Sequence, residues 1–249
     1  SPLSKKTLNY LQRNERTIST EIYQLAVDVF DGWLECDEQY VLDGAYNQIM
    51  AGNVPSVNEY FFDTRARIYQ GDAHGGNVQA SDMARAIVSP CHVPMDYDSK
   101  AALVVLKAEA CDMISGYTVD QCISALKAKN PVEFIRSALT KGTKASTVIK
   151  KPWAFYKISQ LIIALEAGEK PYLDITVGLD AKCSGPQLGA LMVGDNKLAA
   201  ACGFSEVELN DAYLNCCTML EAAGFPGLSR HLIQKPFVGV FYGHGYLAY

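Results

Sequence analysis

Residues 177–187 read V-G-L-D-A-K-C-S-G-P-Q and place one aspartate, Asp180, where a strand is expected to give way to a helix. The residues before it, 171–179, are rich in Ile, Val, Leu and Tyr and are bounded by Pro and Gly, which predicts a buried strand. Ser184 is suited to cap the helix that continues through Leu191. A carboxylate at the end of a strand is a candidate metal ligand, and its alternative role is that of a turn former.

Two further stretches accompany this one: residues 63–69, D-T-R-A-R-I-Y, and residues 230–243, R-H-L-I-Q-K-P-F-V-G-V-F-Y-G. The pattern D-x-x-C-S-G-x-Q around Asp180 resembles motif A of the single-subunit, phage and mitochondrial type of RNA polymerase. Residues 63–69 are similar to the D-x-x-G-R element of that family, with Ala66 in place of its glycine. Residues 230–243 resemble motif B. The three stretches occur in the family's order, and the resemblance extends from about Leu8 to Gly243.

The resemblance implies a mainly α fold with a small antiparallel β-sheet (α+β), forming an incomplete right-hand polymerase core of palm and the start of the fingers. Residues 1–57 are expected to be a helical lead-in. Residues 58–170 are expected to hold a strand with the Asp63–Arg67 element, followed by a helical block. Residues 171–249 are expected to hold the palm strand with motif A and the motif B helix.

The same resemblance implies the roles of the site residues. Asp180 and the backbone carbonyl of Ala181 are expected to bind two Mg²⁺ ions. In motif B, Arg230 and Lys235 are expected to bind the triphosphate of a ribonucleotide, because a triphosphate needs fixed positive charge. Tyr242, followed by Gly243, is expected to favour ribonucleotides over deoxyribonucleotides.

The position of the lysine in motif B departs from the family pattern. Four residues separate Arg230 from Lys235 and six separate Lys235 from Tyr242, where the family has three and seven; Gln234 stands at the expected place. A shift of one residue turns a side chain about 100° around a helix. Pro236 removes one intrahelical hydrogen bond, and we expect a local kink there to bring Lys235 back toward the phosphates.

Two basic segments are candidates for contact with the template or the RNA–DNA hybrid. A strand over residues 59–69 puts Arg65 and Arg67 on one face, either for phosphates or for surface salt bridges. Between Glu133 and Glu166 there are six basic residues and no acidic ones. Three aromatic residues are interleaved at the end of that stretch. This combination predicts a channel for single-stranded template, and the alternative is a solvated face beside a core helix over residues 153–167. The basic residues are Arg136, Lys141, Lys144, Lys150, Lys151 and Lys157, and the aromatic residues are Trp153, Phe155 and Tyr156.

Local patterns predict several helices. Apolar residues at helical spacing over residues 19–33 form one stripe that is expected to enter the core: Ile22, Leu25, Ala26, Val29 and Phe30. Residues 99–115, 118–129 and 131–139 are expected to be helices, the second capped by Thr118 and the third opened by Pro131. One helix is expected from Ser184 to about Ala201. Another is expected to start with a capping box of Ser205 and Glu208 and to end near Ala223.

Composition limits the classes of protein. The net charge of −5 and the pI of 5.4 argue against a protein coated with basic residues, so any nucleic-acid contact has to be local. There is no apolar run of 18 residues, and the first 16 residues are too polar for a signal peptide. The eight cysteines form no C-x-x-C pair, so we expect reduced, mostly buried thiols. These features, with the resemblance, suggest a soluble protein of the cytoplasm of an infected bacterial host.

In these residues no histidine is followed by aspartate, whereas the family takes its second metal-binding aspartate from a His-Asp-Ser motif downstream of motif B. We therefore expect a partner chain to carry that aspartate, as in the smaller subunit of a two-chain phage middle-gene RNA polymerase. The further partners are DNA template, RNA product, ribonucleoside triphosphates and a DNA-melting or single-strand-binding factor. The alternatives are half of a split DNA polymerase, a non-catalytic interaction module derived from a polymerase, and a small metal hydrolase.

Overall fold

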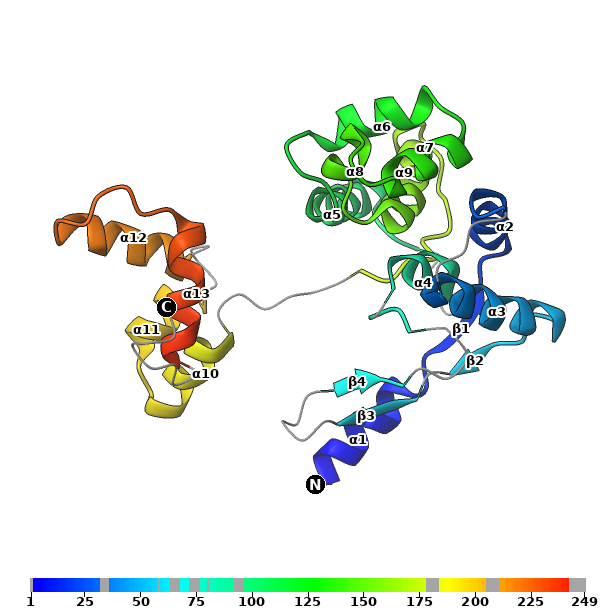
Figure 1. Ribbon diagram of the computed structural model, residues 1–249. Helices are drawn as coiled ribbons and strands as arrows, with labels where there is room; N and C mark the ends of the chain where they lie inside the picture. Colours follow the sequence, from blue (N-terminus) through cyan, green and yellow to red (C-terminus); the bar gives the residue numbers. More distant parts are fainter. Residues whose placement is uncertain are drawn as a thin grey trace. The chain divides into compact units, whose positions relative to one another are not determined.

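The computed structural model divides the chain into two compact units, Ser1–Gly178 and Leu179–Tyr249 (Figure 1). The structure describes residues 2–31, 36–57, 59–62, 68–71, 77–79, 81–91, 96–177, 184–204 and 211–241. The described chain is mainly helical with small antiparallel sheets, so the expected α+β class is confirmed. None of the described helices combines the length and apolar character needed to cross a membrane.

The first unit contains most of the described elements. Its helices are α1 (Pro2–Leu11), α2 (Thr20–Val29), α3 (Cys36–Met50), α4 (Asp82–Ile87), α5 (Ser99–Asp112), α6 (Val119–Lys127), α7 (Pro131–Leu139), α8 (Lys144–Val148) and α9 (Pro152–Glu166). Its strands are β1 (Glu15–Ile18), β2 (Ser56–Val57), β3 (Tyr60–Phe62), β4 (Ile68–Gln70) and β5 (Val88–Pro90).

The strands form two separate antiparallel sheets. One has the order β2-β1-β5, and the other is the pair β3-β4, in which Phe61 lies opposite Tyr69. The single strand expected over residues 59–69 is therefore wrong, because the chain reverses between Phe62 and Ile68 and pairs with itself. The Asp63–Arg67 element lies between these two strands, outside the described residues.

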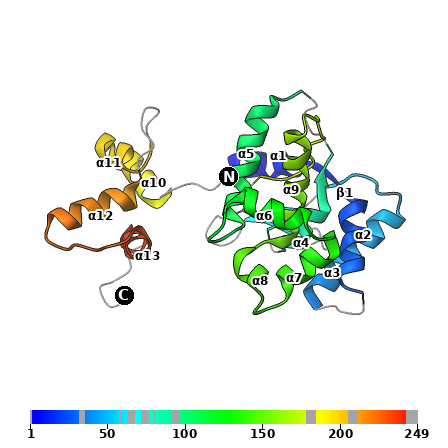
Figure 2. The ribbon, with the colours of Figure 1, turned by 90° about the horizontal axis from the view of Figure 1, so that it is seen from above.

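Helix α9 is the centre of the first unit. It packs against α4, α5 and α7 (Figures 1 and 2), and apolar residues around most of its circumference are buried. The predicted core residues Ile158, Leu161, Ile162 and Leu165 are among them, and the predicted stripe of α2 is buried as well. Both predictions are confirmed, since each depended on the 3.6-residue period of a helix.

The starts of the helices follow from capping groups. Thr118 and Gln121 form a capping box at α6, and Asn130 caps α7, in which Pro131 is the first residue; both predicted starts are confirmed. At α9 the cap comes from elsewhere in the chain. The Asp82 carboxylate accepts hydrogen bonds from the amides of Trp153 (2.9 Å) and Ala154 (3.3 Å). Burial raises the pKa of Asp82, although these two hydrogen bonds act in the opposite direction.

The second unit contains α10 (Ser184–Val193), α11 (Asn196–Ala201), α12 (Ala212–Ala222) and α13 (Arg230–Phe241). Helix α13 packs against both α10 and α12, and a small core forms around Cys202, Ala212 and Tyr213. The helix expected from Ser184 to Ala201 is interrupted, because Gly194 has a φ of 69° and Asp195 caps a new helix. Helix α12 begins at Ala212 with Asp211 as its cap, later than expected, and the predicted Ser205–Glu208 box lies outside the described residues.

The six cysteines whose side chains the structure describes are free thiols. Cys122, Cys202 and Cys217 are buried, Cys91 and Cys216 are half-buried, and Cys111 is exposed. The expected burial thus holds for three of the six.

Candidate functional site

The structure describes four of the ten site residues predicted from the sequence. Arg230 and Lys235 lie on α13, and Lys150 and Lys151 lie just before α9. The other six lie outside the described residues: Arg65, Arg67, Asp180, Ala181, Tyr242 and Gly243.

Arg230, the first residue of α13, is held by contacts that include Asp211 and Tyr213. Its Nε donates a 2.7 Å hydrogen bond to Oδ2 of Asp211, and its guanidinium lies 4.8 Å from the centre of the Tyr213 ring. An arginine at a helix N-terminus faces the positive end of the helix dipole, and the carboxylate of Asp211 offsets that repulsion. Arg230 is therefore positioned by α12 before any ligand arrives.

Asp211 has a second function as the N-cap of α12. Its Oδ1 accepts hydrogen bonds from the amides of Tyr213 (2.9 Å) and Leu214 (3.3 Å). Burial raises the pKa of Asp211, but the hydrogen bonds from Arg230 and from these amides outweigh burial, so the pKa lies below its ordinary value. Asp211 is not among the residues predicted from the sequence, although an aspartate directly before an apolar helix is the usual signal for a cap.

Lys235 lies exposed on α13, and the structure does not place it on the same face as Arg230. The helix continues through Pro236 to Phe241, and five residues of helix separate two side chains by about 140°. Gln234, four residues after Arg230, shares the face of that arginine. The buried face of α13 carries Ile233, with Phe237 packed against the small core.

The end of the stretch that resembles motif A forms the first turn of α10, with Ser184 as the first helical residue. The side chain of Gln187 donates a 2.8 Å hydrogen bond to the carbonyl of Cys202, which ties α10 to the end of α11. Since α10 also packs against α13, the segment that follows Asp180 and helix α13 belong to the same unit.

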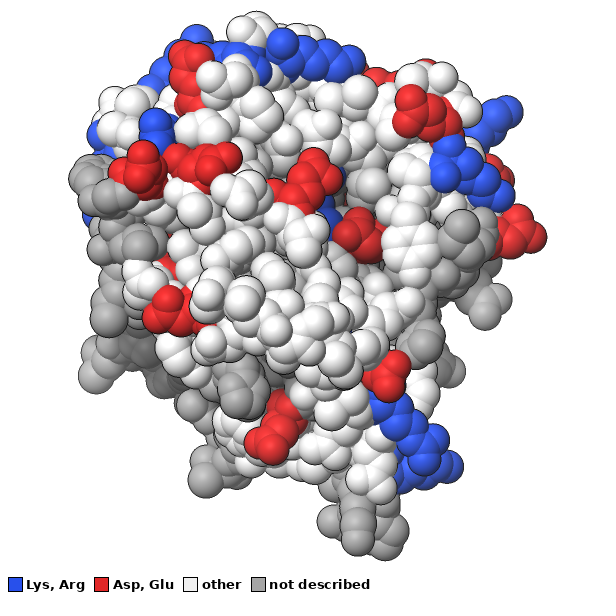
Figure 3. Space-filling model, turned by 90° about the vertical axis from the view of Figure 1, so that its right-hand side faces the viewer, with Lys and Arg blue, Asp and Glu red and all other residues white. Residues whose placement is uncertain are grey.

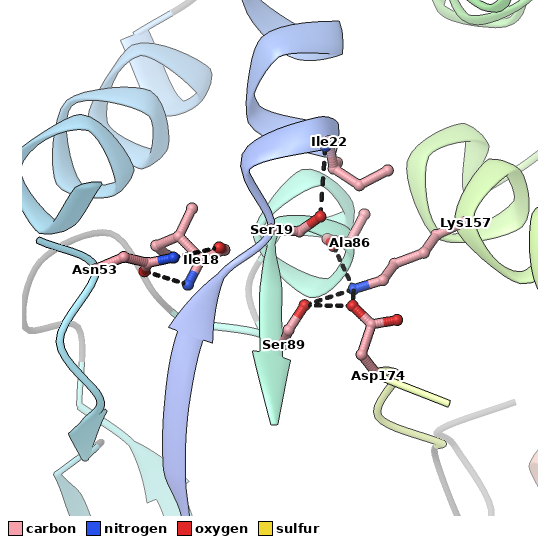
Figure 4. A network of polar contacts seen from close by, with 8 residues as sticks. All are labelled: Ile18, Ser19, Ile22, Asn53, Ala86, Ser89, Lys157 and Asp174. Carbon is pink, nitrogen blue, oxygen red and sulfur yellow. Dashed lines mark hydrogen bonds and ion pairs between the residues drawn. The ribbon is translucent and has the colours of Figure 1, made fainter. Parts of the chain in front are cut away.

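The segment that leads to Asp180 is held by a buried lysine (Figure 4). Lys157 of α9 is only 6% exposed, and its Nζ donates to the carbonyl of Ala86 (3.0 Å) and to Oγ of Ser89 (2.9 Å). The same Nζ lies 3.1 Å from Oδ2 of Asp174, which also accepts a 2.8 Å hydrogen bond from Ser89. Burial lowers the pKa of Lys157, and Asp174 partly reverses that effect.

Residues 171–177 form neither helix nor strand, so the predicted buried strand over residues 171–179 is wrong for its described part. Side chains hold the segment instead of a β-ladder. The Tyr97 hydroxyl donates to the carbonyl of Pro171, and the Tyr172 hydroxyl donates to the carbonyl of Cys91. Leu173 and Ile175 pack against the core of the first unit.

The basic stretch over residues 136–157 is not one continuous surface. Arg136 donates to the carbonyls of Asp28 (2.7 Å) and Val29 (2.9 Å) and so caps the end of α2, and Lys157 is buried as described above. Lys150 is exposed, and Lys151 is half-buried at the N-terminus of α9. On the face of the molecule in Figure 3, the described Lys and Arg side chains lie in separate groups among uncharged ones.

The aromatic part of the template-channel prediction is wrong. Trp153, Phe155 and Tyr156 are at most 6% exposed and pack in the core of the first unit. Their rings contact other core residues, as Phe155 does with Phe134, so they do not present a face on which bases can stack.

The described residues contain no group of three or more His, Cys, Asp or Glu side chains that could hold a metal ion, and Asp180 is not among those residues. A search of protein-family models and of curated proteins found no match to this chain.

Proposed function

We propose that this chain is one subunit of a phage-type DNA-directed RNA polymerase and that it acts in template-directed nucleotidyl transfer. The observation that carries the proposal is the occurrence of three sequence elements in one order: D-T-R-A-R, the D-x-x-C-S-G-x-Q pattern at Asp180, and the Arg-to-Tyr-Gly stretch at residues 230–243.

The donor chemistry at Asp180 and Ala181 fits magnesium. A carboxylate and a backbone carbonyl are the hard oxygen ligands that Mg²⁺ prefers. Bound ions supply charge stabilisation for the transferring phosphoryl group and activation of the attacking hydroxyl. Since one carboxylate does not hold two ions, the second metal-binding aspartate is assigned to a partner chain.

The remaining roles belong to α13 and the residues after it. Arg230, oriented by Asp211 and Tyr213, supplies fixed positive charge for a triphosphate. Tyr242 contacts the sugar. Packing of α10 against α13 within the unit Leu179–Tyr249 supports a single site for Asp180 and motif B, because both belong to that unit.

The experiment is reconstitution with a partner. The chain is isolated from infected cells together with the protein that accompanies it, and both are then produced separately and mixed. We expect background RNA synthesis from this chain alone and magnesium-dependent, template-directed synthesis from the pair. Asp180→Ala should lower the rate of the pair about 10³-fold or more, equivalent to about 4 kcal/mol. The matched control is Asp112→Ala, at an exposed aspartate of the first unit, which should leave the rate unchanged.

The alternatives give different results in the same assay. A split DNA polymerase would use deoxyribonucleotides in preference to ribonucleotides. A pair that assembles but makes no polymer would show a non-catalytic interaction module. RNA synthesis by this polypeptide in the proven absence of another chain would refute the two-chain proposal.

A further inference from the structure

A cavity of about 380 Å³ lies between α6, α7 and α8 in the first unit. This volume is within the range of about 300–1,000 Å³ that is usual for small-molecule sites. The cavity is lined by side chains of all three helices, by Tyr117 before α6 and by Ile149 after α8. It is distant in sequence from residues 177–187 and 230–243, and none of its lining residues belongs to the proposed polymerase site.

The wall of the cavity is mostly apolar. Cys122, Phe134 and Ile149 are each at most 5% exposed and form its buried part, and Ala125 of α6 and Ala145 of α8 line its more exposed part. Burial raises the pKa of the Cys122 thiol, so this wall carries no charge at neutral pH. An apolar wall of this kind favours an aromatic or aliphatic body.

The charged groups at the cavity are of one sign. Lys129 and Lys144 line it, and no Asp or Glu is among its described lining residues. The Lys144 Nζ lies 5.1 Å from the centre of the Tyr117 ring, and this cation–π contact holds the ammonium at the wall. The Lys129 Nζ lies 4.0 Å from Oε1 of Glu133, an exposed pair that leaves the positive charge only weakly compensated.

We propose that this cavity binds a small organic anion with an apolar body, such as an aromatic or medium-chain carboxylate. The apolar body lies against Phe134 and Ile149, and the anionic group lies near the ammonium groups of Lys129 and Lys144. The two features of the wall thus select for one class of ligand. The apolar surface favours binding of the apolar body, and the two lysines attract the anionic group.

The test uses 1-naphthoate and a series of straight-chain carboxylates from hexanoate to dodecanoate, each beside its neutral primary amide. Binding to the full chain is measured by calorimetry. We expect affinity to rise about fourfold per added methylene until the cavity is full, and the carboxylates to bind about fivefold to tenfold more tightly than their amides. Lys129→Gln with Lys144→Gln should remove the preference for the carboxylate. Lys141→Gln, at an exposed lysine outside the lining residues, is the control and should leave it unchanged.

The reactivity of Cys122 shows independently where the ligand binds. Its alkylation, followed by mass spectrometry, should slow when 1-naphthoate binds, whereas the exposed Cys111 should react at the same rate with and without ligand. Ala125→Phe, which fills the cavity, should abolish binding, and Ala145→Leu serves the same purpose if the first variant does not fold.

Three outcomes would overturn the proposal. If no carboxylate binds at millimolar concentration, the cavity is not a binding site. If acid and amide bind equally, the lysines do not contribute to recognition. If the ligand binds without protecting Cys122, it binds outside this cavity. None of these results bears on the polymerase proposal. Failure of RNA synthesis, in turn, does not bear on binding of a carboxylate in this cavity.

Discussion

Asp211 is a single residue that links two helices of the second unit. Its carboxylate caps α12 and also binds the guanidinium of Arg230 at the start of α13. A cap contributes about 1 kcal/mol to stability, and a partly exposed ion pair contributes about 0.5 kcal/mol. The two contributions can be separated, because asparagine retains the capping oxygen but not the charge.

We expect Asp211→Asn to lower the free energy of unfolding of the second unit by about 0.5 kcal/mol and Asp211→Ala to lower it by about 1.5 kcal/mol, measured by denaturant titration. Asp195 is the matched control, since it caps α11 through the amides of Lys197 and Leu198. Asp195→Asn should be nearly neutral. Equal losses for Asp211→Asn and Asp211→Ala would show that the charge, and not the cap, dominates.

The lowered pKa of Asp211 predicts a dependence of stability on pH. A carboxylate with a pKa lower in the folded than in the unfolded chain adds stability above its unfolded pKa of about 3.9, and this stability is lost as the pH falls through the folded pKa. The difference in free energy of unfolding between the wild type and Asp211→Asn should therefore shrink as the pH falls from about 5 to about 2. A difference that is constant over this range would contradict the assigned pKa shift.

Tyr242 is the residue on which the choice of sugar depends in the proposed function. Tyr242→Phe removes only the hydroxyl, so the two-chain enzyme should still make RNA but should accept deoxyribonucleotides more readily. The measurement is the ratio of kcat/KM for a ribonucleotide to that for the matching deoxyribonucleotide. Phe241→Tyr, at the preceding position, is the control for a general change in this segment. An unchanged ratio in Tyr242→Phe would assign the tyrosine a structural role.

At the scale of elements, α9 holds residues 171–177, the segment that leads to Asp180. Lys157 reaches from α9 to β5 and to Asp174, and Asp82 of α4 caps the N-terminus of the same helix. Burying a lysine requires that its ammonium keep polar partners, and three oxygen atoms surround this one. The contacts of α9 with α4, β5 and residues 171–177 therefore depend on one another.

Asp174→Asn should destabilise the first unit by about 2 kcal/mol, because it leaves the buried ammonium of Lys157 without its counter-charge. Hydrogen exchange of the amides in residues 171–177 should become faster, while exchange in α6 should not change. Asp96→Asn is the control, since Asp96 pairs with Lys170 at the surface and should alter neither measurement. A stability equal to that of the wild type would show that Ser89 and the Ala86 carbonyl are sufficient for Lys157.

At the scale of the whole molecule, a net charge of −5 requires that contact with nucleic acid be local. The structure reduces the number of candidate nucleic-acid contacts in the basic stretch. Arg136 donates hydrogen bonds to the end of α2, and Lys157 forms an ion pair with Asp174. Lys150 and Lys151 lie next to each other before α9, and we retain them as the predicted template contacts.

Lys150→Glu with Lys151→Glu should weaken binding of single-stranded template by the proposed two-chain enzyme and should flatten its salt dependence by about one unit of slope per lost phosphate contact. Lys100→Glu with Lys127→Glu changes the net charge by the same amount at two other exposed lysines and is the control. If both pairs of substitutions lower the slope equally, the effect comes from net charge and not from a local contact.

The sequence by itself determined the elements whose signals are local. The apolar stripe of α2, the caps of α6 and α7 and the core residues of α9 all depend on residues within one or two turns of each other. The same local logic produced the errors. It predicted one strand where β3 and β4 pair, and it predicted base-stacking aromatics where Trp153, Phe155 and Tyr156 are buried.

Only the tertiary structure decided which distant groups meet. Arg136 caps a helix that ends 107 residues earlier. Lys157 binds Asp174 and Ser89, and Arg230 forms an ion pair with Asp211, 19 residues before it. No spacing rule encodes these pairs, because they form when packing brings separate elements together and leaves buried charges and helix ends in need of partners. The motifs thus identify candidate site residues in the sequence, while the carboxylate that orients Arg230 becomes visible only when α12 and α13 are packed.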